Sequence, residues 1–163
     1  MISMIRIDDR LVHGQVAVKW SKVLGVNRIV VVNDSIAKNE IQVSALKMAA
    51  PTGVKVAVFP LEKAASVFND PRSKDMKILV VTNEPKYVAD LLPLLNEEPV
   101  LNMANYGRIG GILADKEKIT ETVYLSPEDK KIIQSIFDRG YDFKYQPLPD
   151  DSPQSLKKLI GGK

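Results

Sequence analysis

One short stretch near the amino end concentrates the residues that are best able to do chemistry. The sequence DDRLVHGQV, residues 8–16, contains the only histidine of the 163-residue chain, together with two aspartates, an arginine and a glycine. A neutral imidazole nitrogen can act as a nucleophile, and an arginine nearby can hold phosphoryl oxygens. A carboxylate such as that of Asp8 can orient the other ring nitrogen. These residue types indicate transient acceptance of a phosphoryl group by His13, held by Arg10.

The same residues also admit structural interpretations. A lone histidine before a helix is often a loop residue, and aspartate–arginine pairs are commonly surface ion pairs of small energetic weight. The sequence GRIGG, residues 107–111, could cradle a phosphate, but it lacks the spacing of nucleotide-binding loops, which favours a turn. Trp20 fits the core or the border of a cleft. Asp34 fits a cleft or the cap of the helix that follows it.

Composition narrows the possible functions. The chain has no cysteine, which excludes disulfides and thiol catalysis, and with a single histidine only carboxylates remain as metal ligands. We therefore expect no metal and no organic cofactor. The formal charge of +3 is too small to indicate nucleic-acid binding. The ordinary apolar content predicts one globular domain over residues 1–163, and the strand-sized apolar runs predict a cytoplasmic protein without a membrane span.

The elements that must position these residues alternate between strands and helices. The expected strands are Ile2–Ile7, Arg28–Asn33, Val54–Phe59, Lys77–Thr82, Val100–Ala104, Glu121–Leu125 and, as a half-exposed edge, Tyr141–Gln146. The expected helices are Gln15–Leu24, Asn39–Ala50, Leu61–Asn69, Pro85–Leu95, a helix from Pro127 to Gly140, and a short last helix. The first of them places Val16, Trp20, Val23 and Leu24 on one face. The fourth has Asn83 as its expected cap and Pro93 as a break. This alternation predicts an α/β fold.

Several strands are apolar at consecutive positions, as in a parallel sheet that is covered on both faces. We expect a single open, mostly parallel sheet, whose ligands lie at the carboxyl ends of its strands. Polar residues gather at these ends: Asp8, Asp9, Arg10 and His13 after the first strand, Asn33 and Asp34 after the second, and Tyr106–Arg108 after the fifth. The free amides of Gly14 and Gln15, at the start of a helix, would form an anion site there.

A family resemblance extends this hypothesis. The stretch RIDDRLVHGQVAVKW, followed at the expected distance by RIVVVND, resembles the IIB component of the mannose/fructose/sorbose family of the bacterial phosphoenolpyruvate-dependent sugar phosphotransferase system. The resemblance spans nearly the whole chain. It implies a mostly parallel sheet of about seven strands, in keeping with the seven expected above.

The resemblance also implies a mechanism and partners. The phosphorylated histidine of the family matches His13, which would react through Nδ1, and the residues beside the phosphate match Asp8 and Arg10. We expect Asp9, Gly14, Gln15, Asn33 and Asp34 to line the same cleft. The phosphoryl donor would be a IIA component, and the acceptor a sugar brought across the membrane by IIC and IID, which would hold the protein peripherally at the membrane. A second copy of the chain, in a homodimer, is a further candidate partner.

One segment departs from the family pattern. Where many relatives carry an Asn-Val-Gly-Gly-Met-like loop, this chain reads NMANYGRIGG, from Asn102 to Gly111, at a place expected to affect partner or sugar specificity. The acceptor sugar is a hexose or an amino sugar, and this unusual segment favours N-acetylgalactosamine. The alternatives are a non-catalytic nucleotide-binding or regulatory module that uses the Gly107–Gly111 loop, and a regulator that is phosphorylated but transfers to no sugar.

Overall fold

The computed structural model describes residues 1–161, in which strands and helices alternate. The strands are β1 (Ile2–Asp8), β2 (Arg28–Val32), β3 (Lys55–Phe59), β4 (Ile78–Thr82), β5 (Val100–Asn105), β6 (Glu117–Thr120), β7 (Val123–Leu125), β8 (Phe143–Tyr145) and β9 (Gln154–Ser155). The α-helices are α1 (Gly14–Leu24), α2 (Glu40–Met48), α3 (Leu61–Asn69), α4 (Pro85–Leu91), α5 (Pro127–Asp138) and α6 (Leu156–Gly161).

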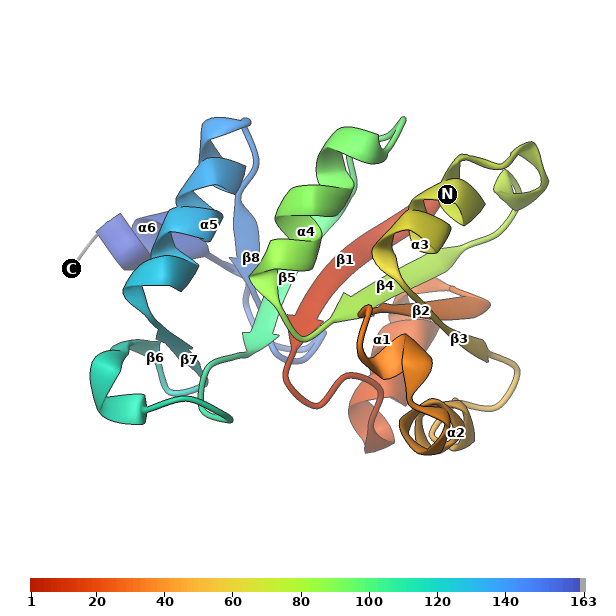
Figure 1. Cartoon of the computed structure of the whole chain (residues 1–163), viewed down its shortest axis with the longest axis horizontal. Coiled ribbons are helices and arrows are strands. Elements are labelled where there is room, and N and C mark those ends of the chain that lie inside the picture. The colour runs from red at the N-terminus through yellow and green to blue at the C-terminus, as the bar shows by residue number, and fades with distance from the viewer. Residues whose placement is uncertain (162–163) are drawn as a thin grey trace.

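Seven of the strands form one sheet, in the order β3-β2-β4-β1-β5-β8-β9. All neighbouring strands in it run parallel except β8 and β9, which are antiparallel. The expected α/β fold, with one open and mostly parallel sheet, is confirmed. Strand β1 lies between β4 and β5, so the loop that follows it leaves from the middle of the sheet (Figure 1).

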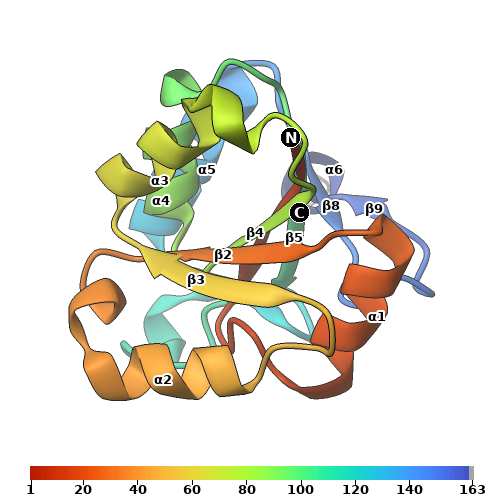
Figure 2. The same ribbon diagram turned by 90° about the vertical axis from the view of Figure 1, so that its right-hand side faces the viewer.

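Helices cover both faces of the sheet: α1 and α2 lie on one side, and α3, α4 and α5 on the other (Figure 2). Successive side chains of a strand point to opposite faces. In β1, Ile5 and Ile7 belong to one apolar cluster, whereas Met4 packs with Ala17 and Trp20 in the other. Met4 and Arg6 therefore face α1, and Asp8 at the end of the strand pairs with Arg6 on the same side.

Two expectations for the sheet were wrong in part. Within Glu121–Leu125, only Val123–Leu125 is a strand, and this β7 pairs with β6 in a separate antiparallel hairpin. The seventh strand of the main sheet is β9, whose two residues are too few to show a strand pattern. Strand β8 is consequently flanked by β5 and β9 and does not form the edge that the alternation in Tyr141–Gln146 suggested.

The helix boundaries agree closely with the expected ones. Gly25 ends α1 with a φ of 65°, and α4 ends at Leu91, just before a 3-10 turn that contains Pro93. Trp20 is a core residue with 4% exposure. Val23 was expected on the buried face of α1 but is 66% exposed, because the buried side of this helix runs through Ala17, Trp20 and Ser21.

The amino end of α4 differs from expectation as well. Asn83 does not cap this helix, because Glu84 occupies the capping position without a side-chain hydrogen bond. The side-chain oxygen Oδ1 of Asn83 instead accepts from Nδ2 of Asn33 at 2.9 Å. Ser126, by contrast, caps α5 as part of a reciprocal capping box with Asp129. None of the helices within residues 1–161 has both the length and the apolar character needed to cross a membrane.

Candidate functional site

The loop between β1 and α1 is fixed by hydrogen bonds at successive residues. The Asp9 amide donates to the Asn105 carbonyl at 2.8 Å, and the Leu11 amide to the Asp8 carbonyl at 3.0 Å. The Arg10 amide donates to Asp8 Oδ1 at 2.9 Å. Leu11 has a φ of 57°, a conformation that a residue other than glycine keeps only when its surroundings enforce it. These bonds fix the backbone of the loop and therefore the positions from which the Arg10 and His13 side chains extend.

The two ring nitrogens of His13 face different partners. Nε2 lies 3.2 Å from Asp8 Oδ2, and Nδ1 lies 2.9 Å from an Nη of Arg10. Since an ionised carboxylate only accepts hydrogen bonds and a guanidinium only donates them, the proton belongs on Nε2 and a lone pair on Nδ1. The side chain is 18% exposed, so Nδ1 can be reached from outside once Arg10, itself exposed, moves aside. The arrangement presents Nδ1 as a nucleophile.

Asp8 is held in place by a buried arginine. The side chains of Asp8 and Arg6 are 0% and 3% exposed, and Arg6 Nη2 donates to Asp8 Oδ2 at 3.0 Å. Burial lowers the pKa of Arg6 and the Asp8 carboxylate opposes this change, so the guanidinium keeps its charge. The Asp8 carboxylate thus receives hydrogen bonds from the Arg6 side chain, the Arg10 amide and the His13 ring, which together fix its orientation.

Two segments that are distant in sequence complete the surroundings of Arg6. Its Nη1 donates to the side-chain oxygen Oδ1 of Asn102 at 2.7 Å, and its Nη2 to the backbone carbonyl of Pro147 at 3.0 Å. The Trp20 indole donates to the same Pro147 carbonyl at 3.0 Å, and the guanidinium lies 5.4 Å from the centroid of the Trp20 ring. Asn102, fully buried in β5, also donates to the Gln146 carbonyl at 3.0 Å. The buried Arg6 guanidinium therefore has hydrogen-bond acceptors from three segments of the chain and an aromatic ring beside it.

The amino end of α1 faces the same loop. His13 is its capping residue but makes no side-chain capping bond, and the first turn contains no acidic residue. Amides of a first helical turn have no partner within the helix and carry the positive end of its dipole. Gly14 and Gln15 are exposed there, so their main-chain N–H groups face solvent beside the His13 loop.

Asp9 is directed away from His13. Its Oδ2 accepts from the Gly107 amide at 2.9 Å, and the Ile109 amide is a further donor to it. Burial raises the pKa of Asp9 to about 6, an effect that the hydrogen bond from Gly107 opposes. The sequence predicts this carboxylate in the cleft around His13. It instead ties the loop between β5 and β6 to the His13 loop.

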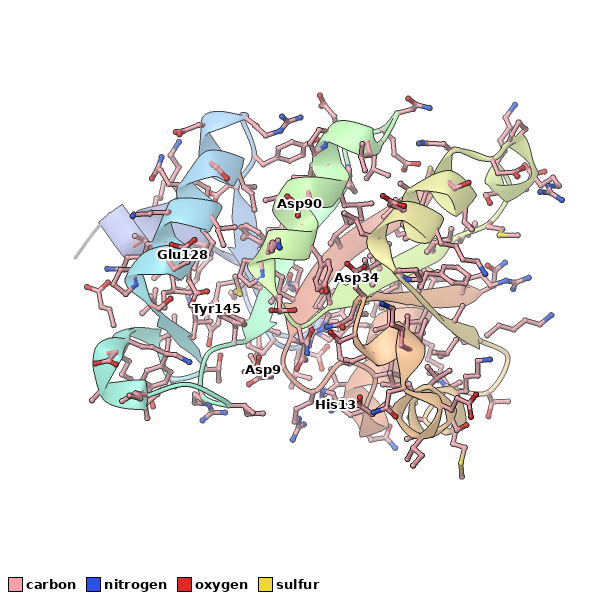
Figure 3. The ribbon with its side chains drawn as sticks, viewed as in Figure 1. Asp9, His13, Asp34, Asp90, Glu128 and Tyr145 are labelled. Atoms are coloured by element: carbon pink, nitrogen blue, oxygen red, sulfur yellow. The ribbon has the colours of Figure 1, made fainter. Side chains whose placement is uncertain are left out.

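Asn33 and Asp34 build turns on the same rim. The side-chain oxygen Oδ1 of Asn33 accepts from the Ile36 backbone amide at 2.8 Å, and Asp34 Oδ1 accepts from the Leu61 backbone amide at 2.8 Å. Asp34 thus caps the start of α3 and not the helix that follows it in sequence. In Figure 3, Asp34 lies at the same end of the sheet as Asp9 and His13, as the parallel topology predicts. The side chains of Asn33 and Asp34 therefore stabilise these turns, and their hydrogen bonds do not involve the His13 ring.

The residues after β5 divide between the interior and the surface. The Tyr106 hydroxyl donates to Asp129 at 2.7 Å, and burial raises the pKa of this phenol. Gly107 is buried, whereas Arg108 is exposed. Asn102–Ala104 belong to strand β5, as expected, and the strand extends to Asn105, so the segment that departs from the family pattern begins within a strand.

Sequence reasoning missed Arg6 and Asn102 as parts of the site. A signal for Arg6 was present, because a single charge within the apolar run Ile2–Ile7 must find a partner when the strand is buried. Nothing local marked Asn102 or the carbonyl of Pro147. Their roles depend on the pairing of β1 with β5 and on the return of the chain after β8.

The comparisons with known proteins bear on this geometry. A sequence model described as the sorbose subfamily IIB component of the phosphotransferase system matches residues 2–163. The chain belongs to this family. A probable phosphotransferase enzyme IIB component of Streptococcus pyogenes is 39% identical over 98% of this chain and 99% of its own length. The sorbose-specific EIIB component of Lacticaseibacillus casei is also 39% identical, over 98% of this chain and 95% of its own.

A solved structure supports the same assignment. The crystal structure of the IIB domain of the sorbose permease from Klebsiella pneumoniae matches with a TM-score of 0.91 and 29% identity, covering 100% of this chain and 98% of the other. The protein is thus a sugar phosphotransferase component of the sorbose/mannose family.

Two further relatives show how this IIB family varies. The mannose-specific EIIAB component of Escherichia coli is 28% identical over 98% of this IIB chain, which covers only 48% of that longer protein. The structure of an N-acetylgalactosamine-specific IIB component from Escherichia coli matches with a TM-score of 0.82 and 30% identity, covering 94% of this chain and 98% of the other. Relatives of one fold therefore differ in their named sugar and in whether a IIA part shares the polypeptide.

The Arg6–Asp8 pair yields a stability prediction. Arg6→Met keeps most of the side-chain volume but leaves the Asp8 carboxylate buried with one charge partner fewer, which should lower the free energy of unfolding by about 3–5 kcal/mol. Urea unfolding followed by the fluorescence of Trp20, which shares the Pro147 carbonyl with Arg6, measures this loss. The control is Arg72→Met in the exposed pair with Asp70, which should leave the midpoint unchanged. Equal effects of the two substitutions would contradict the central role of the buried pair.

The raised pKa of Asp9 yields a pH prediction. The folded state binds the Asp9 proton more tightly than the unfolded state, whose pKa is about 3.9, so ionisation of Asp9 opposes folding. This cost is absent below pH 4, grows between pH 4 and 6, and is fully present above pH 6. Asp9→Asn keeps an oxygen for the Gly107 amide and removes the cost. Its stability relative to the unmodified protein should rise as pH increases from 4 to 7.

The measurement is a series of urea titrations between pH 4 and 7. Asp70→Asn serves as the control, because the pKa of Asp70 is lowered to about 2 by its hydrogen bonds with Arg72. The contribution of Asp70 changes only at lower pH, so its difference curve should be flat above pH 5. A flat curve for Asp9→Asn as well would show that burial of Asp9 does not oppose its ionisation.

Proposed function

We propose that the protein accepts a phosphoryl group from a IIA component on His13 Nδ1 and transfers it to a sugar delivered by IIC and IID. The observation that carries this proposal is the pair of contacts at the ring, with Asp8 at Nε2 and Arg10 at Nδ1. These contacts select the tautomer whose free lone pair faces the exterior. They also place a guanidinium where phosphoryl oxygens would arrive.

In the first transfer, the Nδ1 lone pair forms a bond to phosphorus while the bond from phosphorus to the histidine of IIA breaks. The His13 ring keeps its Nε2 proton and becomes positively charged, and the buried Asp8 carboxylate stabilises this charge. Arg10 turns from Nδ1 to the phosphoryl oxygens, and the first-turn amides of α1 donate to them. The residues thus supply orientation and electrostatic stabilisation, which dominate catalysis of phosphoryl transfer.

In the second transfer, a sugar hydroxyl attacks phosphorus, the P–N bond breaks, and its electrons return to Nδ1 as a lone pair. The hydroxyl proton passes to a base on the sugar-binding side. This step requires a cytoplasmic protein that docks reversibly on the IIC and IID membrane components. We assign the acceptor as a hexose or an amino sugar, because the names of relatives include sorbose, mannose and N-acetylgalactosamine.

The Gly107–Gly111 loop does not favour the nucleotide-binding alternative. The Gly107 and Ile109 amides already donate to Asp9. The loop is followed by a 3-10 turn of three residues and then a hairpin, where a nucleotide-binding motif would have an α-helix. A regulator without sugar transfer would still be phosphorylated at His13. Incubation of the labelled protein with IIC–IID vesicles and a panel of sugars separates this regulator from a transferase.

Replacement of His13 tests the site. His13→Ala should fold normally, because Asp8 keeps its bonds from Arg6 and the Arg10 amide, and it should accept no phosphate from phosphorylated IIA. The unmodified protein should carry acid-labile, base-stable phosphorus, as expected of phosphohistidine. Circular dichroism checks the fold of the variant. Labelling of His13→Ala at the normal level would refute the assignment, since the chain has no second histidine.

Arg10 is expected to act through the shape of its side chain. Arg10→Lys keeps the charge but loses the planar fork that grips two phosphoryl oxygens. The loss of one charge-assisted contact, about 1.5–3 kcal/mol, should slow transfer from IIA by about tenfold or more. Rapid-quench measurements at saturating IIA give the rate, and Arg139→Lys at the end of α5 is the control. An unchanged rate for Arg10→Lys would show that the guanidinium does not bind the phosphoryl oxygens and only contacts the His13 ring at the surface.

A further inference from the structure

Helix α2 presents apolar side chains on the face that is turned away from the sheet. Ile41 and Met48 are 83% and 87% exposed, the highest fractions among the large apolar side chains of residues 1–161. Seven residues make about two helical turns, so these two side chains lie on the same side of the helix. Ser44 and Ala45 lie between them on that side and are also exposed. We call these four side chains the outer stripe.

The opposite side of α2 is the one that packs against the protein. Leu46, and Ala49 at the end of the helix, pack against the apolar cluster that contains Trp20 and Val56. No residue of α2 is buried. In Figure 2 the helix lies along β3 at the outside of the molecule, with no element on its far side. The outer stripe therefore leaves its apolar surface uncovered within one chain, and contiguous apolar surface commonly marks an interaction site.

Two charged residues flank the outer stripe on one side. Glu40 and Lys47 are also seven residues apart, so they share a side of the helix and are separated by about 10 Å along its axis. At that separation they cannot pair with each other. Neither has an ion-pair partner in the part of the chain that the structure describes. The flank of the stripe thus carries an acid near the amino end of α2 and a base near its carboxyl end.

We propose that the outer stripe binds the outer stripe of a second copy of this chain, with the two α2 helices antiparallel. A two-fold axis between Ser44 and Ala45 then places Ile41 against the partner's Met48 at each end of the contact. The small side chains at the centre let the two helices approach closely, so that the larger ones can interlock. Each apolar side chain of the stripe thus finds its complement in the same stripe on the partner.

The flanking charges select this occupant and this orientation. In the antiparallel pair, Glu40 lies beside Lys47 of the partner subunit, and the two-fold axis repeats the contact at the other end. In a parallel pair these residues would lie on opposite sides of the seam, where they do not meet. An anionic lipid surface would attract Lys47 but repel Glu40. Charges that flank the apolar seam between helices set the choice and orientation of the partner, and here they match a second copy.

The interface is small, so the dimer is weak. Stable interfaces bury about 800 Å² on each partner and use about 20–30 residues a side. One stripe of four side chains on a nine-residue helix, with two flanking charges, is well below that size. Exposed ion pairs add little affinity, so the contact between Glu40 and Lys47 sets the orientation more than the strength. The protein is therefore monomeric when dilute and pairs when it is concentrated.

The pairing keeps the two His13 loops apart. The chain enters α2 from the end of β2 that carries Asp34, so the amino end of this helix lies at the same end of the sheet as His13. Antiparallel pairing of α2 turns the two His13 loops to opposite ends of the dimer. Each loop keeps its own access, and the pairing does not depend on the phosphoryl transfer proposed above.

Sedimentation equilibrium between about 10 and 500 μM measures the pairing. The unmodified protein should shift from monomer to dimer over this range, and Ile41→Ser with Met48→Ser should remain monomeric. The control, Val23→Ser with Ile112→Ser, removes apolar side chains that are 66% and 67% exposed elsewhere on the surface, and it should pair normally. Circular dichroism checks that all variants fold. An unmodified protein that stays monomeric, or equal losses in the stripe variant and the control, would overturn the proposal.

A charge exchange tests the role of the flanking residues. Glu40→Lys and Lys47→Glu, made singly, each replace two attractive contacts in the dimer by two repulsive ones. Each should raise the dissociation constant by about tenfold. The double variant reverses both charges and should recover the affinity of the unmodified protein. A double variant as weak as the single ones would show that the two residues do not meet across the interface.

Cross-linking tests the orientation. The chain has no cysteine, so introduced cysteines report only the designed contact. A mixture of Ile41→Cys and Met48→Cys proteins should form a disulfide-linked heterodimer on mild oxidation. Ile41→Cys alone should not, because its two copies lie about 10 Å apart along the antiparallel helices. Rapid linkage of Ile41→Cys to itself would contradict the antiparallel pair. Binding of the stripe to phosphatidylglycerol vesicles without any dimer in solution would assign it to a lipid surface and equally overturn the proposal.

Discussion

The buried pair of Arg6 and Asp8 is the interaction on which the rest of the site depends. Charges so far from water are tolerated only when they are paired and fully hydrogen-bonded. Arg6 meets this requirement with acceptors from β1, β5 and the segment after β8. The need to satisfy one guanidinium therefore fixes how the carboxyl-terminal part of the sheet closes around β1.

The chemistry of the ring follows from the same pair. Asp8 cannot rotate, since its two oxygens are engaged by the Arg6 side chain and the Arg10 amide, so the direction of its bond to His13 is set before any partner arrives. Arg10 has the opposite character, because it is exposed, and in the proposed transfer it exchanges the ring nitrogen for phosphoryl oxygens. For the phosphoryl transfer proposed above, a fixed carboxylate behind the ring and an exposed cation in front of it suit a residue that is loaded and unloaded at similar free energies.

Much of this arrangement could be predicted from the sequence, wherever the signal is local. Consecutive apolar runs indicated the parallel strands, Gly25 and Ser126 marked helix ends, and the spacing of Asp8, Arg10 and His13 indicated their proximity. The features that were missed depend on pairing between distant segments: β9 has two residues, and Asn102 looks like any polar residue until β5 lies beside β1. The turn roles of Asp9 and Asp34 were likewise hidden, because their amide partners are 98 and 27 residues away.

The Pro147 carbonyl, which accepts hydrogen bonds from both Arg6 and Trp20, is synthesised long after these two residues. Arg6 and Pro147 are separated by 141 positions, and a ribosome adding about 5–20 residues per second needs on the order of ten seconds to pass from one to the other. During that interval the nascent chain already contains its histidine loop but lacks the carbonyl that completes the support behind it. If His13 carries phosphate as proposed, this competence arises late in translation, because an unfinished chain lacks the Pro147 carbonyl that supports Arg6.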